Sequence, residues 1–202
     1  MSDRGPREWL DEIERLDQAV YGAIATTPTP RLDVAMRRLS EAANYSRLSI
    51  ASAAVLAIAG GPRGRRAAAL GLSCVATTAT FVNVVVKPVG RRRRPDRASA
   101  GVPTARQVDL PGSRSFPSGH TAAAVAFAHG VARVLPSAGI PLYALAAVVG
   151  YSRVHTGVHY PGDVVAGALL GAMSADLTAN QVERLLTSPP ARRLRGQSTS
   201  DR

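Results

Sequence analysis

The sequence predicts an all-α fold, an antiparallel transmembrane bundle of about five apolar helices preceded by an N-terminal amphipathic helix. Residues 67–86 are twenty consecutive uncharged residues, which is close to the length that crosses a bilayer. Several other apolar runs are rich in Ala and Gly and have no polar face to turn toward water. Near the N-terminus, apolar residues recur at helical spacing.

The N-terminal segment 9–25 places its apolar residues on one face of a helix and its acidic groups on the others. Pro28 and Pro30 end this helix, and residues 32–43 form a second, short amphipathic stretch. No apolar block follows the charged N-terminus, unlike in an ordinary secretory signal peptide. We therefore expect residues 1–47 to form amphipathic, interfacial helices, with these residues on the apolar face of the first: Trp9, Ile13, Leu16, Val20 and Ile24.

Residues 48–180 are predicted to form the helical bundle. Residues 48–60 and 67–86 are expected to pair as a hairpin, joined by an Arg-rich turn at 61–66 that favours the cytoplasmic side. A polar excursion over 88–117 leaves the hydrocarbon. Three more apolar stretches follow, and the basic residues 181–202 are predicted to be a disordered tail. The three stretches are 119–135, 140–151 and 164–177, the last with Gly167 and Gly171 spaced for close helix contacts.

Runs of this length also fit the core helices of a soluble all-helical protein, which is the alternative fold. The net charge indicates which partners the chain can bind. The sequence has 25 Lys and Arg against 14 Asp and Glu, a net charge of +11, which suits phosphate-rich ligands or an anionic membrane surface. Aromatic residues make up only 4% of the chain, so stacking on single-stranded nucleic acid is disfavoured and no nucleic-acid partner is predicted. A single cysteine, Cys74, excludes an intramolecular disulfide and a multi-cysteine metal site.

Histidine is confined to one stretch of 40 residues, which indicates a functional site. His120 follows Pro117-Ser118-Gly119, where an apolar helix begins, and His159 lies in a polar segment before another apolar helix. His129 is expected on the far side of its helix, in a packing role. His155 is expected in a structural or rim role.

Phosphoryl transfer without a metal needs cations for the phosphate oxygens, a nucleophile, a group that orients it and an acid for the leaving oxygen. Lys87, Arg94 and Arg153 supply positive charge. Ser118 and the Gly119 amide lie where a helix begins, and such amides bind anions.

His159 and Asp163 are four residues apart, so on the first turn of a helix they would share a face. The Asp163 carboxylate would hold the Nδ1 proton and leave Nε2 free to attack phosphorus. His120 would protonate the leaving alkoxide and then accept a proton from the hydrolytic water. For Arg91, Arg92 and Arg93 we expect attraction of anionic substrate or headgroups, or a solvated charge run.

Three spaced blocks carry a specific resemblance. They are Lys87-x6-Arg94-Pro95, Pro117-Ser118-Gly119-His120 and Ser152-Arg153-x5-His159-x3-Asp163. Together they resemble the signature of the type 2 phosphatidic acid phosphatase superfamily, over about residues 67–175. The resemblance implies an antiparallel helical bundle that hydrolyses lipid phosphates without a metal or other cofactor.

Carried over to this sequence, the resemblance implies phosphate binding by Lys87, Arg94, Ser118, Gly119 and Arg153. It implies catalysis by His159 as nucleophile, His120 as acid and base, and Asp163 as the orienting group.

The predicted function is hydrolysis of a lipid or polyprenyl phosphate monoester or pyrophosphate through a phosphohistidine. The predicted location is a multi-pass position in the inner (plasma) membrane, with the active site on the extracytoplasmic side. Two alternatives stay open, a non-catalytic membrane protein that binds lipid phosphate and a vanadium-dependent haloperoxidase, whose vanadate imitates the phosphoryl-transfer geometry.

Overall fold

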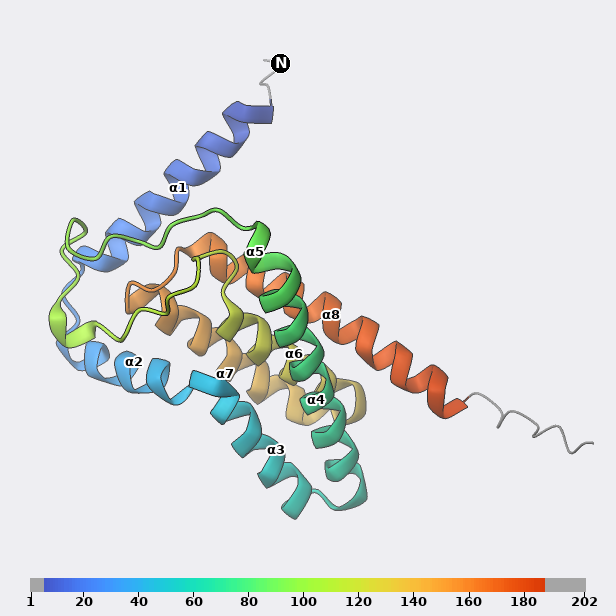
Figure 1. Ribbon diagram of the computed structural model, residues 1–202. Coiled ribbons are helices and arrows are strands. Elements are labelled where there is room, and N and C mark those ends of the chain that lie inside the picture. The colour runs from blue at the N-terminus through green and yellow to red at the C-terminus, as the bar shows by residue number, and fades with distance from the viewer. Residues whose placement is uncertain (1–5, 188–202) are drawn as a thin grey trace, which may run out of the picture.

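The computed structural model describes residues 6–187 and is built of helices and irregular loops throughout this part (Figure 1). The predicted all-α class is confirmed. The principal helices are α1 Pro6–Thr26, α2 Pro30–Ala42, α3 Arg47–Ala59, α4 Gly61–Phe81, α5 Lys87–Val89, α6 Gly119–Val134, α7 Pro136–His155 and α8 Pro161–Thr187.

The two N-terminal helices follow the predicted pattern. Helix α1 ends at Thr26, and Pro30 occupies the first turn of α2, where its missing N–H costs no hydrogen bond. Helix α1 projects from the rest of the molecule in Figure 1. Its predicted apolar residues Trp9, Ile13, Leu16 and Val20 are exposed.

A sharp bend joins α2 to α3 through the short 3₁₀ turn Asn44–Ser46. The two arms lie at 67° to each other. Tyr45 and Ser46 both have positive φ, at 55° and 56°, a conformation that is uncommon outside glycine. The bend places Asn44 beside the beginning of α6, where the candidate site lies.

Helices α3 and α4 form the predicted hairpin, but the turn is shorter than expected. It occupies Gly60 and Gly61, and Gly61 has a φ of +59° that a residue with a side chain rarely adopts. The arginines predicted to lie in this turn, Arg63, Arg65 and Arg66, already belong to the beginning of α4. A proline near the first position starts a helix readily, so Pro62 begins α4 early.

Helix α4 continues through a π-helical turn, Val82–Val86, into α5. The segment Gly61–Val89 is long and apolar enough to cross a membrane, and its most apolar window of 18 residues has a mean hydropathy of 1.8. Only 28% of its most apolar window is buried, whereas a core helix of a soluble protein is mostly buried. By length and composition it is the single such helix in residues 6–187, or one of two if the bent pair α2–α3 is one span.

Helix α6 lies at the centre and packs against α4, α7 and α8. Its buried face is made of small residues and Phe127, which let the neighbouring backbones approach closely. The predicted close contact of Gly167 and Gly171 is confirmed, since a Cβ on Gly167 would lie 2.5 Å from the Ser118 carbonyl oxygen and one on Gly171 would clash with Ala122.

Helix α8 runs further than predicted. It continues to Thr187, so the boundary placed at residue 180 is wrong, because the sequence offers no Pro or Gly to stop the helix there. Arg133 of α6 also donates to Asn180 and Glu183 on this last part of α8. The rest of the predicted basic tail, residues 188–202, lies outside the described residues.

A long polar loop, residues 90–118, covers the end of the bundle where α5 ends and α6 and α8 begin (Figure 1). Arg106 anchors this loop to the N-terminal helices. Its fully buried guanidinium donates to the carbonyl oxygens of Ile24 and Thr27 and pairs with Asp33 at 2.9 Å. The loop is therefore held across the candidate site.

Candidate active site

Lys87 and Arg94 are joined through Ser113 of the polar loop. The Lys87 Nζ donates to Ser113 Oγ at 3.3 Å, and Arg94 Nη2 donates to the same oxygen at 3.3 Å. Arg94 Nε also donates to the Ser113 carbonyl oxygen at 2.9 Å. These two predicted phosphate-binding cations thus lie side by side, as a phosphate would need them.

Ser118 and Gly119 stand at the predicted helix start. Ser118 is fully buried at the N-cap of α6; its Oγ lies 2.9 Å from Thr121 Oγ1, and its amide donates to the carbonyl oxygen of Asp163 at 2.9 Å. A Cβ added to Gly119 would lie 3.6 Å from Lys87 Nζ, so the ammonium rests against the first residue of the helix. A helix N-terminus and a lysine together favour an anion here.

His159 lies in the loop between α7 and α8, two residues before Pro161, and not on the helix as predicted. Gly157, with a φ of +70°, turns the chain, and the imidazole is almost fully buried. Its Nδ1 lies 3.4 Å from Asp163 Oδ2, and its Nε2 lies 3.4 Å from Arg94 Nη1. Because a guanidinium only donates, this arrangement assigns the proton to Nδ1 and the lone pair to Nε2.

The surroundings keep His159 neutral. Burial lowers its pKa to about 4, the Arg94 and Arg153 guanidiniums act in the same direction, and Asp163 opposes them. Burial also lowers the pKa of Arg94 from its usual value, against the attraction of Asp163. The unprotonated Nε2 is therefore available as a nucleophile at neutral pH.

Asp163 is fully buried and held from several sides. The Ser115 hydroxyl and the Tyr160 amide both donate to Oδ2, and Arg92 donates to Oδ1 at 3.2 Å. Arg92 also pairs with Asp17 of α1 at 2.6 Å. The expectation that Arg92 serves as a general attractor of anions is wrong, because its guanidinium is committed to these two carboxylates.

His120 begins α6 and has an unpredicted partner. Its Nε2 lies 2.9 Å from Asn44 Oδ1 in the α2–α3 bend. With the amide in this orientation, Nε2 of His120 carries a proton and donates it to the Asn44 oxygen.

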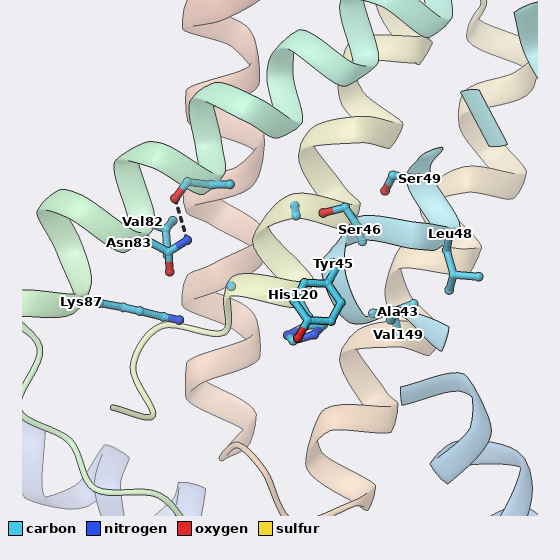
Figure 2. A pocket seen from close by; sticks show the side chains of 14 residues that line it. Ala43, Tyr45, Ser46, Leu48, Ser49, Val82, Asn83, Lys87, His120 and Val149 are labelled. Atoms are coloured by element: carbon cyan, nitrogen blue, oxygen red, sulfur yellow. Dashed lines mark hydrogen bonds between the residues drawn. The ribbon is translucent and has the colours of Figure 1, made fainter. Parts of the chain in front are cut away.

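A cavity of about 270 Å³ opens beside His120, lined by Lys87, Gly119 and mostly apolar side chains of α3, α4 and α6. Figure 2 shows Lys87 reaching into this opening from one side, with Tyr45 and Ser46 on the other.

Arg153 is buried at the end of α7. Its Nη1 donates to Ser40 of α2, to Oγ at 2.5 Å and to the carbonyl oxygen at 3.2 Å. Arg153 and Asn44 line the same second cavity, which links Arg153 to the His120 side of the site.

Direct contacts run from Arg94 to His159 to Asp163, and Asp163 accepts from the Ser118 amide. Lys87 joins Arg94 through Ser113. The remaining two histidines have separate partners. His155 pairs with Asp33 at 2.9 Å, and His129 pairs with Asp176 at 2.8 Å near the opposite end of α6.

Sequence reasoning missed the residues that hold this site in place. Asn44, Ser40 and Asp17 come from the first 47 residues, which carry no motif. Ser115 and Arg92 are close in sequence to motif residues, and that proximity was the one available signal.

In the described range 6–187, no group of three or more His, Cys, Asp or Glu side chains could hold a metal ion.

Comparison with known proteins identifies the family of this chain. A family model described as "PAP2 superfamily" matches residues 67–186. The chain belongs to the PAP2 superfamily. The match begins within α4 and ends within α8, so it includes all three motif blocks of this PAP2 chain.

Two mycobacterial relatives are named decaprenylphosphoryl-5-phosphoribose phosphatase. The Mycobacterium tuberculosis (strain CDC 1551 / Oshkosh) protein is 40% identical over 48% of this PAP2 chain, which spans about half (51%) of that relative's length. The Mycolicibacterium smegmatis protein is 35% identical over 78% of this chain and 84% of its own length.

A solved structure shares the fold. The transmembrane PAP2 type phosphatidylglycerolphosphate phosphatase from Bacillus subtilis has a TM-score of 0.64 and 26% identity, over 86% of this chain and 88% of that one. The resemblance read from the three motif blocks is confirmed.

Proposed function

We propose that this PAP2 chain is a membrane lipid phosphatase that hydrolyses a lipid or polyprenyl phosphate monoester or pyrophosphate through a phosphohistidine on His159. The observation that carries the proposal is the buried imidazole of His159, with Nδ1 toward Asp163 and Nε2 toward Arg94. A nucleophile beside a fixed cation and an orienting carboxylate is the arrangement that phosphoryl transfer requires.

In the first step, His159 Nε2 attacks phosphorus and the bond from phosphorus to the leaving oxygen breaks. Lys87, Arg94, Arg153, Ser118 and the Gly119 amide stabilise the charge on the phosphoryl oxygens. His120 takes part as an imidazolium, with a proton on each ring nitrogen; it gives the Nε2 proton, which otherwise points to Asn44, to the leaving alkoxide and becomes neutral. The products are a phosphohistidine and a free lipid alcohol, or a lipid monophosphate when the substrate is a pyrophosphate.

In the second step, His120 accepts a proton from water as the water oxygen attacks the phosphohistidine. The bond between phosphorus and Nε2 breaks, inorganic phosphate leaves and His159 regains its lone pair. Asp163 holds the Nδ1 proton throughout and favours the positive charge that His159 carries while it is phosphorylated. Every step uses side chains of this protein, so the proposed reaction needs no metal.

Exposed apolar side chains support a position in the membrane. On α8, Val165, Leu169, Met173 and Leu177 form a stripe at intervals of four residues, and all are exposed. Helix α4 is largely unburied along its apolar length. Continuous apolar surface of this kind suits lipid and not water.

We place residues 48–180, together with the last turns of α8, in a multi-pass bundle of the plasma membrane, and α1 at the membrane interface. The active site then lies on the extracytoplasmic side, because the Arg-rich beginning of α4 and Lys87 of α5 are at opposite ends of the continuous helical segment Gly61–Val89. The apolar cavity beside His120 would receive the first part of the lipid chain, next to the leaving oxygen.

The test is release of inorganic phosphate by the full chain, purified in detergent, from a panel of lipid phosphates and pyrophosphates. EDTA is present throughout, and His159→Ala is the inactive control. We expect release by the wild type and none by the variant. Equal release by both, or release that requires added Mg²⁺, would contradict the proposed mechanism, and halide oxidation with vanadate would favour a haloperoxidase.

A further inference from the structure

Helix α1 carries a buried carboxylate that faces the active site. Within residues 8–26 of this helix, three side chains at intervals of four are buried: Asp17, Tyr21 and Ala25. Asp17 is only 7% exposed, and a buried charge is costly unless it is paired and hydrogen-bonded. Packing alone would favour an apolar residue at this position, so the carboxylate calls for another explanation.

Asp17 contacts two groups that adjoin Asp163. Its Oδ1 accepts from the amide of Gly162 at 2.6 Å, and Gly162 directly precedes Asp163 in the first turn of α8. Its Oδ2 lies 2.6 Å from Arg92 Nη1. The same Nη1 lies 3.2 Å from Asp163 Oδ1, so one guanidinium nitrogen bridges the two carboxylates. Asp17 is therefore connected to the orienting carboxylate through the backbone and through a shared cation.

The packing around Arg92 holds this bridge in place. Its guanidinium carbon lies 4.2 Å from the centroid of the Tyr160 ring, a cation–π contact. Tyr160 packs edge-on against Tyr21 of α1, with ring centroids 5.4 Å apart. A Cβ on Gly162 would lie 2.9 Å from Asp17 Oδ2, so α1 and the start of α8 are in close contact. The bridge thus differs from a surface ion pair, whose mobile side chains contribute little.

The shared cation affects how well Asp163 can assist His159. In the proposed reaction the phosphorylated imidazole is positive, and the negative charge of Asp163 stabilises it. An arginine paired with Asp163 alone would offset much of that charge. Because Arg92 is closer to Asp17 than to Asp163, it can hold Asp163 in place while two carboxylates and one guanidinium keep one net negative charge.

We propose that Asp17 is a positioning residue for the reaction at His159, an inference that rests on the proposed phosphatase function. It holds Asp163 and preserves the negative charge of this carboxylate through the shared arginine and the first turn of α8. Asp17 lies outside residues 67–186, which the family model matches, so the family signature does not include it. It does not line the cavity beside the proposed acid either, and its loss should therefore affect turnover and not substrate binding.

The experiment replaces Asp17 with Asn, which keeps an oxygen for the Gly162 amide and removes the charge that faces Arg92. Asp11→Asn is the matched control, because it makes the same chemical change at an exposed position of α1. The full-chain proteins are purified in detergent, and kcat and KM per folded molecule are measured with farnesyl phosphate, farnesyl pyrophosphate and phosphatidate. We expect Asp17→Asn to lower kcat by about tenfold, the scale of one charge-assisted hydrogen bond, with KM within about twofold of wild type. Asp11→Asn should match wild type.

A second comparison separates positioning from support of the fold. Arg92→Gln removes the cation that connects the two carboxylates, so it should also lower kcat. If Asp17 acts through Arg92, adding Asp17→Asn to Arg92→Gln should lower kcat by less than about twofold further. A residue that only packs α1 would instead lower the folded fraction in both backgrounds and leave kcat per folded molecule unchanged. If Asp17→Asn yielded no folded protein, Asp17→Glu, which displaces the charge by one methylene, should show the lowered kcat.

Several outcomes would overturn the inference and leave the phosphatase function intact. They are a wild-type kcat for the folded Asp17 variant, an effect confined to KM, an equal loss in Asp11→Asn, and a full tenfold loss in the Arg92→Gln background. Release of phosphate by the wild type from none of the three substrates would overturn the proposed function and this inference together.

Discussion

Two buried histidines that are four residues apart in the chain, His155 and His159, each pair with an aspartate. The two pairs differ in whether a nitrogen of the imidazole remains free to react. His155 uses both nitrogens: Nε2 pairs with Asp33 at 2.9 Å, and Nδ1 accepts from the Tyr151 hydroxyl at 3.3 Å. His159 directs Nδ1 to Asp163 and turns Nε2 toward Arg94. Each aspartate also has its own arginine, Arg106 or Arg92.

This comparison teaches that a histidine–aspartate pair is not by itself a sign of catalysis. The pair at His155 has no nitrogen left to react, and it ties α7 to α2 and, through Arg106, to the polar loop. At His159, the carboxylate fixes one nitrogen so that the other keeps its lone pair beside a cation. The difference between the two pairs can be tested by substituting the corresponding residue, histidine or aspartate, in each pair.

The largest difference is expected when each imidazole is removed. His159→Ala should lower kcat by about 10⁴-fold or more, because the nucleophile is lost. His155→Gln should retain turnover per folded molecule. Phosphate release, normalised to the folded fraction from size-exclusion chromatography, measures both. If the folded His155→Gln protein were as inactive as His159→Ala, the division between the pairs would be wrong.

Removing the proposed acid should have a smaller effect that depends on the substrate. His120→Ala should lower kcat by about 10²- to 10⁴-fold for lipid phosphates, whose alkoxide needs a proton to leave. For an aryl phosphate with an acidic leaving group the loss in the first step should be much smaller, and an acid-labile phosphoenzyme should accumulate. Rapid-quench labelling with radioactive phosphate measures that species. An equal loss on both substrate types would contradict the role of His120 as acid.

The same change at the two carboxylates should separate activity from stability. Asp163→Asn should lower kcat by about 100-fold or more, since the amide can no longer hold the Nδ1 proton. Asp33→Asn should instead destabilise the fold by about 3 kcal/mol, because Arg106 loses its buried partner. Thermal unfolding in detergent and phosphate release distinguish the two effects. A normal melting temperature for Asp33→Asn would argue against a structural role for the His155 pair.

The smallest expected effect is a change of pH near neutrality, which should leave the activity that depends on His159 almost unchanged. His159 has a folded pKa of about 4 and reacts only when neutral, so it stays competent above that value. We expect protonation of His159 to lower kcat/KM only as the pH falls through about 4. Between pH 6 and 7, kcat/KM should show no fall from this cause. A pH profile with one aryl phosphate substrate measures this. A limb near the ordinary histidine value of about 6.5 would show that burial does not set the pKa.

Sequence reasoning predicted which motif residues come together better than it predicted the residues that hold them in place. The three motif blocks carry the cations, both histidines and Asp163, and their four-residue spacing predicted the His159 pair even though His159 precedes the helix. Asn44 was beyond prediction, because its place depends on positive φ at Tyr45 and Ser46, which neither residue type signals.

Helix ends were predictable where a clear breaker exists and less so elsewhere. Pro28 and Pro30 separated α1 from α2 as expected, whereas α8 passed residue 180 because nothing in the sequence stops it. Arg92 and Asp17 are 75 positions apart, and only the path of the polar loop brings them together. Contacts of this kind depend on tertiary structure, and local pattern does not encode them.

The contact between Gly167 and the Ser118 carbonyl carries a mechanical consequence. Ser118 is the N-cap of α6, so the distance between the backbones of α6 and α8 sets the positions of Gly119 and His120. A single methyl group on Gly167 would push that turn outward without touching any charged side chain. In the proposed mechanism, the distance from His120 to the leaving oxygen therefore depends on the absence of a side chain at Gly167, and an apolar substitution there should slow the reaction.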